Sequence, residues 1–511
     1  MCLKTTFGLF YSYNLRYSLV FSRPHNEVFA ARLNNTRLLQ PRRGGTMLIN
    51  PSAQPDLPNI DAAKAAASAV NLDLDNIQGD IMIGMRKKNE LFFFFGISNT
   101  THFKAKLKST ILPLVTNTAQ LLDVAQQPQT ALNIAFTQTG LNALNVRDSL
   151  NDSLFSGGQL QDVNNLGDPG TKNWVPVFVG TNIHGVILLA SDSERNMEIT
   201  LASLKSQLGG CITEIYELQG AARPGNQEGH EHFGYLDGIS NPAVEGFQSP
   251  HPGQAIVPTG EILVGENGDS VSRPPWAKGG SFLVFRQLKQ LVPEFNKFLA
   301  DNPIRRQGLT QQEGSDLLGA RMIGRWKSGA PVFLAPWKDD PALGADPQRN
   351  NDFTYAAPGQ ISGNLTDQSR CPFSAHIRKT RPRGDLGLPE KNSHHIVRGG
   401  IPYGPEVTPL EAFTHTTKTE RGLAFVSYQS NIANGFQFLQ QKWADNNKFI
   451  HAGVGFDPII GSAQGAHRVV TGLDPTGLSR SITLTTDFVV SRGGEYFFSP
   501  SLSAISDTLS A

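Results

Sequence analysis

A short run between Phe233 and Pro242 holds the residue types best suited to chemistry in this chain. It reads Phe-Gly-Tyr-Leu-Asp-Gly-Ile-Ser-Asn-Pro and places a carboxylate, Asp237, between glycines inside an otherwise apolar stretch. Glycines such as Gly234 and Gly238 let a backbone bend, or approach a ligand, where a side chain would block it. A carboxylate held in this way could transfer protons as a general base, or it could cap the loop as an Asx-turn.

Two later segments add a histidine and several cations. Cys-Pro-Phe-Ser-Ala-His-Ile-Arg surrounds His376, and His-His-Ile-Val-Arg-Gly-Gly-Ile-Pro-Tyr-Gly surrounds Arg398. An imidazole commonly holds haem iron, although a single histidine is more often a surface or core residue. Arg378 follows His376 by two residues, and further cations stand at positions 379, 381 and 383. Such a cluster suits the propionates of a haem, or it forms a solvated basic loop.

Taken together, the three segments resemble those of the dye-decolourising peroxidase family, which are haem enzymes. The resemblance covers roughly residues 75 to 500, and the long spacing between Asp237 and His376 resembles that of fungal-type members. It implies one haem b per chain, with His376 as the axial ligand of the iron and Arg378 beside the propionates. It also implies that hydrogen peroxide oxidises the haem and that dyes, phenols and similar aromatic donors then react in one-electron steps through a ferryl intermediate. The alternative from another class is a haem-binding or haem-delivery protein without significant turnover.

The resemblance also implies roles on the other face of the haem. Asp237 would take a proton from bound peroxide and return it to the departing oxygen, help that is typically worth about 10²–10⁴-fold. Arg398 would stabilise the developing negative charge. Leu423 and Phe425 would form an apolar lining that keeps water out, although by type they suit a strand core equally well. An Asp base has an ordinary pKa of about 3.9, against about 6.5 for a histidine, so we expect an acidic pH optimum.

Three further roles complete the predicted site. A ligating imidazole is usually oriented by a carboxylate, and we choose Asp457 for this role, with Asp445 as the second choice. Because bulky dyes cannot reach a buried haem, the family oxidises some of them at surface aromatic residues. Tyr403 and Trp443 stand where such residues occur in fungal-type members, although a tryptophan on a helix is more often a core residue.

Other motifs carry no comparable signal. The triplet His-Glu-His at 230–232 and the histidine pair at 394–395 could suggest zinc, but no third and fourth ligand follows at a recognised spacing. Cys371 could be a thiolate ligand of haem iron, but the nearby His376 fits better. Gly-rich stretches do not match a phosphate-binding motif.

Composition predicts a globular chain of two or three domains. Its 511 residues exceed the roughly 100–200 of one domain. A net charge of +1 gives no reason to expect nucleic-acid binding. No apolar run reaches the ~18 residues that a membrane-spanning helix needs. The three cysteines form no CxxC pair, so the fold should not depend on disulfides. We expect a monomer or a homodimer.

The N-terminus leaves the compartment open. The first 46 residues carry seven Lys or Arg and a single acid, Glu27, and they lack a clean secretory signal. A mitochondrial presequence, a translation start at Met47, and the secretion implied by the family resemblance therefore remain alternatives. Residues 1–72 are expected to be a poorly ordered tail or targeting segment, in which the Pro- and Ala-rich part from Asn50 reads as a linker followed by a short helix.

Hydrophobic periodicity predicts an α+β fold of two ferredoxin-like (βαββαβ) domains with antiparallel sheets, and the resemblance agrees. The first domain, residues 73–250, should contain strands at 91–97, 131–137, 185–190 and 212–218, and helices at 101–115 and 196–208. The second, haem-binding domain, residues 251–511, should contain strands at 281–285, 423–428 and 488–498, and helices at 293–300 and 435–444. Between Asn302 and Arg398 lies a long insertion with little periodicity, which we expect to be functional because it contains His376.

Overall fold

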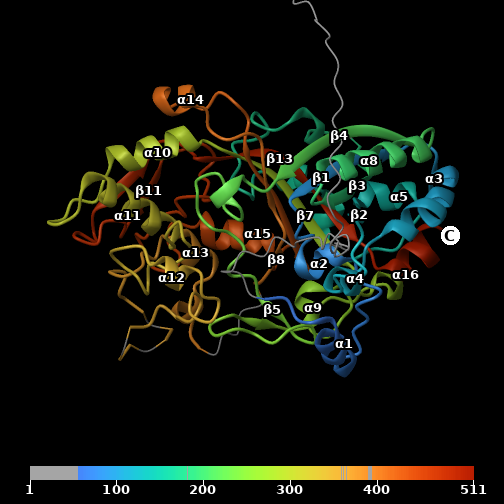
Figure 1. Cartoon of the computed structure of the whole chain (residues 1–511), viewed down its shortest axis with the longest axis horizontal. Coiled ribbons are helices and arrows are strands. Elements are labelled where there is room, and N and C mark those ends of the chain that lie inside the picture. Colours follow the sequence, from blue (N-terminus) through green and yellow to red (C-terminus); the bar gives the residue numbers. More distant parts are fainter. Residues whose placement is uncertain (1–55, 181, 358, 361, 364, 389–393) are drawn as a thin grey trace, which may run out of the picture. The chain divides into compact units, whose positions relative to one another are not determined.

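The computed structural model describes residues 56–511, except 181, 358, 361, 364 and 389–393, and Figure 1 shows its elements. The predictions about a targeting segment and the start residue lie outside the described residues. The short helix predicted before Leu72 is present as α1 (Ile60–Ala69). The Asn59 side chain accepts from two backbone N–H groups of its first turn, and the helix buries Ala63 and Ala67. None of the helices in the described part is both long and apolar enough to cross a membrane.

The first half of the chain forms four antiparallel strands in the order β2-β3-β1-β4. Each of these strands overlaps a predicted one: β1 (Asn89–Ile97), β2 (Thr130–Phe136), β3 (Gly185–Ser191) and β4 (Ile212–Ala221). The helical segment that begins with α3 (Thr100–Lys106), and α8 (Glu194–Leu208), lie beside these strands (Figure 1). Side chains alternate along β1, so Phe93 and Phe95 join the core under these helices while Phe92 and Phe94 join another core on the opposite face. A run of phenylalanines therefore forms a strand that is buried on both faces.

The second half repeats the same arrangement in the order β9-β10-β7-β13. Its predicted strands are present as β7 (Ser281–Gln290), β10 (Gly422–Gln429) and β13 (Val489–Ser499). The predicted helices are present as α10 (Val292–Asp301) and as α15 (Phe436–Phe438), which continues as a π-helix, η7 (Leu439–Ala444). The short strands β8 (Val397–Arg398) and β9 (Ile401–Tyr403) were not predicted. Their hydrophobic signal is too short, and a proline in β9 is unfavourable inside a strand.

The two halves close into one ring of strands because they pair with each other at both edges. β4 meets β9 at Gly220 and Tyr403, and β2 meets β13 at Phe136 and Phe498, each through a single residue pair. A Cβ atom on Gly220 would lie 2.9 Å from the Pro402 carbonyl oxygen, so only glycine allows this approach. Strands from both predicted domains therefore contribute to one closed sheet, and the core containing Phe92 and Phe94 fills its inside.

The long insertion contains one substantial helix that the sequence pattern did not predict, α11 (Gln311–Ile323). Its hydrophobic residues form no single stripe, because most of the helix is buried on all sides. Gly314 and Gly319 permit close contacts, since a Cβ atom there would lie 2.4 Å from the Ile304 carbonyl and 2.2 Å from the Tyr235 hydroxyl. α11 lies beside α10, and the insertion then leads to the short helix α13 (His376–Thr380) (Figure 1).

The remaining α-helices and β-strands are short. These are α2 (Gly79–Ile83), α4 (Thr118–Leu122), α5 (Gln138–Ala143), α6 (Ser153–Gly157), α7 (Gln159–Asp162), α9 (Thr259–Ile262), α12 (Pro341–Gly344), α14 (Pro409–Thr414), α16 (Leu502–Ala504), the pair β5 (Ala243–Val244) and β6 (Ile256–Val257), and the pair β11 (Arg468–Thr471) and β12 (Ser481–Leu484).

Candidate active site

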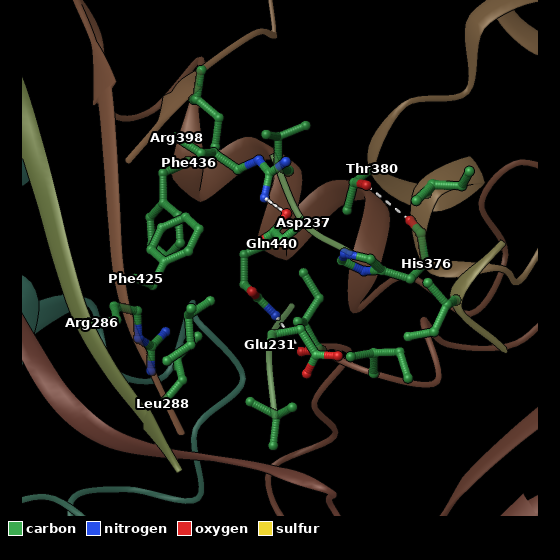
Figure 2. A pocket seen from close by; sticks show the side chains of 18 of the residues that line it. Glu231, Asp237, Arg286, Leu288, His376, Thr380, Arg398, Phe425, Phe436 and Gln440 are labelled. Carbon is green, nitrogen blue, oxygen red and sulfur yellow. Dashed lines mark hydrogen bonds and ion pairs between the residues drawn. The ribbon is translucent and has the colours of Figure 1, made fainter. Parts of the chain in front are cut away.

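A cavity of about 300 Å³ lies on the outer face of the second half's sheet. Along β10 the side chains alternate, so Ala424 and Val426 enter the core inside the ring while Leu423 and Phe425 line the cavity. The predicted residues Asp237, His376 and Arg398 line the same cavity. Figure 2 shows the imidazole of His376 pointing into the space that Asp237 and Arg398 also enter.

Asp237 is held by its own loop and by an ion pair. Its Oδ1 accepts from the backbone N–H of Gly238 at 2.6 Å and from Nη1 of Arg398 at 2.8 Å. About a third of each side chain, 36% for Asp237 and 30% for Arg398, remains accessible, and both side chains line the cavity. Burial opposes ionisation of the carboxyl, but the Arg398 guanidinium and the Gly238 N–H hold the pKa of Asp237 below its ordinary value. These contacts therefore favour the carboxylate form of Asp237.

Arg398 is positioned by an amide that the sequence analysis did not single out. Asn241 Nδ2 donates to the carbonyl of Arg398 at 2.9 Å, and Asn241 Oδ1 accepts from the backbone N–H of Arg398 at 3.1 Å. This two-way contact ties β8 to the segment that carries Asp237. The position of Asn241 within the same motif, four residues after Asp237, was the available signal.

His376 is the first residue of α13, and a buried carboxylate fixes its ring. Its Nδ1 lies 2.8 Å from Oδ2 of Asp457, whose Oδ1 accepts from the backbone N–H groups of Ile459 and Ile460. Burial disfavours the charged form, but His376 and these N–H groups lower the pKa of Asp457, so it is an anionic acceptor. Asp445, the second choice, instead accepts from Gln440 and from the backbone N–H of Ser462.

The groups in the cavity fit a haem. With Nδ1 of His376 donating to Asp457, the lone pair is on Nε2, which has no hydrogen-bond partner among the described residues. An imidazole oriented in this way is the usual proximal ligand of haem iron. Apolar side chains, among them Leu423 and Phe425, line much of the cavity, and Arg381, which also lines it, provides a cation for a carboxylate.

The prediction for Arg378 was wrong in its placement, because Arg378 does not line the cavity. It is 1% exposed, and its Nε and Nη2 donate to the two oxygens of Asp385 at 2.8 and 2.7 Å. The helix geometry explains this: residues two apart on a helix do not share a face, so a side chain two positions after His376 points away from it. Arg381 and Arg383, in the same basic segment, line the cavity instead.

Tyr403 and Trp443 are not surface residues, so that part of the prediction needs correction. Tyr403 is 3% exposed because it lies at the seam between the two halves, and its hydroxyl donates to Glu420 at 3.0 Å. Trp443 is 4% exposed and stacks on Phe449, with ring centroids 5.1 Å apart. Of the two residues, Trp443 is connected to the cavity through one neighbour. The centroid of its ring lies 5.5 Å from that of His394, which lines the cavity.

Comparisons with known proteins identify the family and the fold. The family model described as the DyP dimeric alpha+beta barrel domain matches residues 76–224, and the model for the C-terminal part of Dyp-type peroxidases matches residues 230–452. Peroxidase 2 of Mycetinis scorodonius is 58% identical over 490 residues, which cover 93% of this chain and 94% of that protein. The dye-decolorizing peroxidase AauDyP1 of Auricularia auricula-judae is 52% identical, over 97% of this chain and all of that protein. The crystal structure of AauDyP complexed with imidazole superposes with a TM-score of 0.83 and 54% identity, covering 86% of this chain and all of that one.

Proposed function

The chain belongs to the dye-decolourising peroxidase family, and from this we propose that Asp237, Arg398 and His376 carry the family's chemistry here. The protein is a haem peroxidase that uses hydrogen peroxide to oxidise dyes and similar donors. The observation that carries the assignment of residues is that one cavity is lined by an ion-paired carboxylate and by an imidazole bound to a second carboxylate.

His376 would bind the iron of haem b through Nε2. Asp457 would keep the proton on Nδ1 and hold the ring in orientation, which makes the imidazole a stronger electron donor. Arg381 would bind a propionate, the role that the sequence predicted for Arg378. When bound, haem b supplies the iron that receives peroxide and stores the two oxidising equivalents that donors later remove.

Asp237 would act as the proton carrier for cleavage of the O–O bond. Its carboxylate would accept the proton of the peroxide oxygen nearer the iron and deliver it to the outer oxygen, which leaves as water. Arg398 would hold the carboxylate in place through the 2.8 Å contact and stabilise the negative charge that develops on the leaving oxygen. Because the pKa of Asp237 is held below its ordinary value, its carboxylate would remain competent where a distal histidine would be protonated.

The walls of the cavity would determine which donors are oxidised directly. Leu423 and Phe425 would exclude water from the reacting face and leave no room for a bulky dye. Small phenols could approach the haem edge, whereas larger dyes would give their electrons to an aromatic residue. Trp443 is the better candidate for this, through its contact with His394. Each chain carries a complete set of these groups, so a monomer or a homodimer would hold one haem per chain.

Steady-state oxidation of an anthraquinone dye by the haem-loaded protein tests this assignment. We expect His376→Ala to lose haem on gel filtration, and Asp237→Ala and Arg398→Ala to keep haem but lose peroxide-dependent turnover. Full activity in the last two variants would contradict the catalytic roles of Asp237 and Arg398, whereas a haem-loaded wild-type protein without turnover would leave only a haem-binding or haem-delivery role. A maximum of activity above neutral pH would contradict Asp237 as the base.

A further inference from the structure

The His-Glu-His triplet at 230–232 has no part in the chemistry described so far. Across the described stretches of the chain, no group of three or more His, Cys, Asp or Glu side chains could hold a metal ion. The triplet's side chains go to different places. His232 Nε2 lies 2.9 Å from the carbonyl oxygen of Tyr403, whereas Glu231 lines the cavity together with Asp237 (Figure 2). Glu231 is therefore a further carboxylate at the cavity wall, and the proposed chemistry does not use it.

Glu231 lies inside the tight hairpin that ends at Asp237. The backbone N–H of Asp237 donates to the Gly229 carbonyl at 3.0 Å, and the N–H of Glu231 donates to the Tyr235 carbonyl at 3.0 Å. The N–H of Gly234 donates back to the Glu231 carbonyl at 2.8 Å, and Gly234 has a φ of 92°, which favours glycine. The conformation of this hairpin therefore determines the position of the Asp237 backbone, from which its side chain extends into the cavity.

The carboxylate of Glu231 completes the hydrogen bonding of the hairpin tip. Its Oε2 accepts from the backbone N–H of Phe233 and its Oε1 from that of Tyr235, both at 2.8 Å. Buried backbone donors need partners, so loss of these acceptors would force the tip to rearrange. One side chain thus fixes the turn that lies immediately before Asp237.

The same carboxylate connects the hairpin to the sheet. Gln290, the last residue of β7, donates its Nε2 to Oε2 of Glu231 at 2.5 Å. The backbone carbonyl of Glu231 accepts from Nη1 of Arg223 at 2.7 Å, and His232 adds the contact with Tyr403 on β9. The hairpin is therefore tied to both β7 and β9, and Glu231 makes the contact with Gln290, which lines the cavity.

We propose that Glu231 is a positioning residue, which holds the hairpin so that the Asp237 carboxylate meets both Arg398 and the substrate peroxide. This inference rests on the proposed role of Asp237. Burial raises the pKa of Glu231, the backbone N–H groups of Tyr235 and Phe233 oppose this, and the carboxylate of Asp237 raises it slightly further. Glu231 itself does not transfer a proton in this scheme, because both its oxygens are already occupied by donors.

Glu231→Gln is the direct test, because the amide keeps the size of the side chain but places an NH₂ group against a backbone donor. Cyanide binding to the ferric protein is the first readout, since the incoming HCN must give its proton to the distal base. A misplacement of about 1 Å can cost about 10²-fold, so we expect a 10–100-fold weaker cyanide affinity and a similarly slower reaction with peroxide. Haem content and melting temperature report separately on structural damage.

Glu495→Gln is the matched control. Glu495 is likewise a carboxylate that accepts from two backbone N–H groups, those of Gln159 and Tyr496, but it does not line the cavity. We expect this variant to bind cyanide like the wild type. Gln290→Leu serves as a second variant, because it removes only the tie to β7, and it should weaken cyanide binding in the same direction but by less.

The outcomes separate this inference from the proposed function. Wild-type cyanide affinity in Glu231→Gln, with Asp237→Asn weakened, would overturn the inference alone. If Glu231→Gln does not fold, wild-type affinity in Gln290→Leu would overturn it instead. Equal losses in Glu231→Gln and Glu495→Gln would also overturn it, since the role would then be general stability. Unchanged binding in Asp237→Asn would refute the role of Asp237 and, with it, this inference.

Discussion

Replacement of Asp237 by asparagine isolates proton transfer from the geometry of the site. Oδ1 of Asp237 accepts from both Gly238 and Arg398, so the oxygen of an asparagine can keep both contacts. What the amide cannot do is accept a proton. Proton transfer by a positioned side chain contributes about 10²–10⁴-fold, and we expect a loss in this range in the second-order rate constant for peroxide. At about 1.36 kcal/mol for each factor of ten, this corresponds to about 2.7–5.4 kcal/mol in the barrier.

Stopped-flow absorbance of the haem band, after mixing with one equivalent of peroxide, measures this rate constant directly. Asp487→Asn is the matched control, because Asp487 lines the same cavity but pairs with Arg468, whose Nε lies 3.0 Å from its Oδ1. We expect the control to change the rate by less than about threefold. If Asp237→Asn also changes the rate by less than about threefold, the carboxylate is dispensable and Asp237 is not the proton carrier.

The remaining predictions concern pH, ligand orientation, electron transfer and stability. In the proposed mechanism the carboxylate form of Asp237 is active, and the pKa of this group is lowered. Activity should therefore persist below the ordinary Asp pKa of about 3.9 and fall only at lower pH. In a pH–rate profile Arg398→Leu should move this acid limb to higher pH, and an unmoved limb would contradict the role of the ion pair. Asp457→Asn should weaken haem binding to the apo-protein by about 10–100-fold in a spectrophotometric titration, the usual cost of losing a carboxylate behind a ligating histidine, and unchanged affinity would argue against it. Trp443→Phe should slow oxidation of a bulky anthraquinone dye but not of a small phenol; equal effects on both donors would exclude a relay. Arg378→Met should lower the free energy of unfolding, measured in urea, by about 3–5 kcal/mol, because it leaves the buried carboxylate of Asp385 without its partner. A loss of haem affinity without a loss of stability would contradict a structural role for Arg378.

The sequence predicted which side chains gather in the cavity better than it predicted the contacts that support them. Asp237, His376 and Arg398 could be identified because their types and motifs are specific, and they share one cavity. The side on which a residue lies needs the local structure, and Arg378 shows this. Only once His376 is known to begin a helix does a position two residues later point away from the cavity.

In the fold, too, the elements defined by local sequence could be predicted, whereas contacts between distant segments could not. Strands with a strong apolar pattern, such as β1 and β10, were predicted because their burial follows from alternation. The seam at Gly220 and Tyr403 could not be predicted, because it depends on the approach of two segments far apart in the chain. Tyr403 is buried because it lies at this seam, so its burial could not be predicted from the sequence either.

In the proposed function, one porphyrin has His376 on one face and the Asp237–Arg398 pair on the other. A crystal structure of the haem-loaded protein with cyanide tests it most directly. We expect the iron to be bonded to Nε2 of His376, with the cyanide nitrogen in contact with Asp237 or Arg398 on the opposite face. A haem ligated by any other residue, or a cyanide remote from both side chains, would contradict the account.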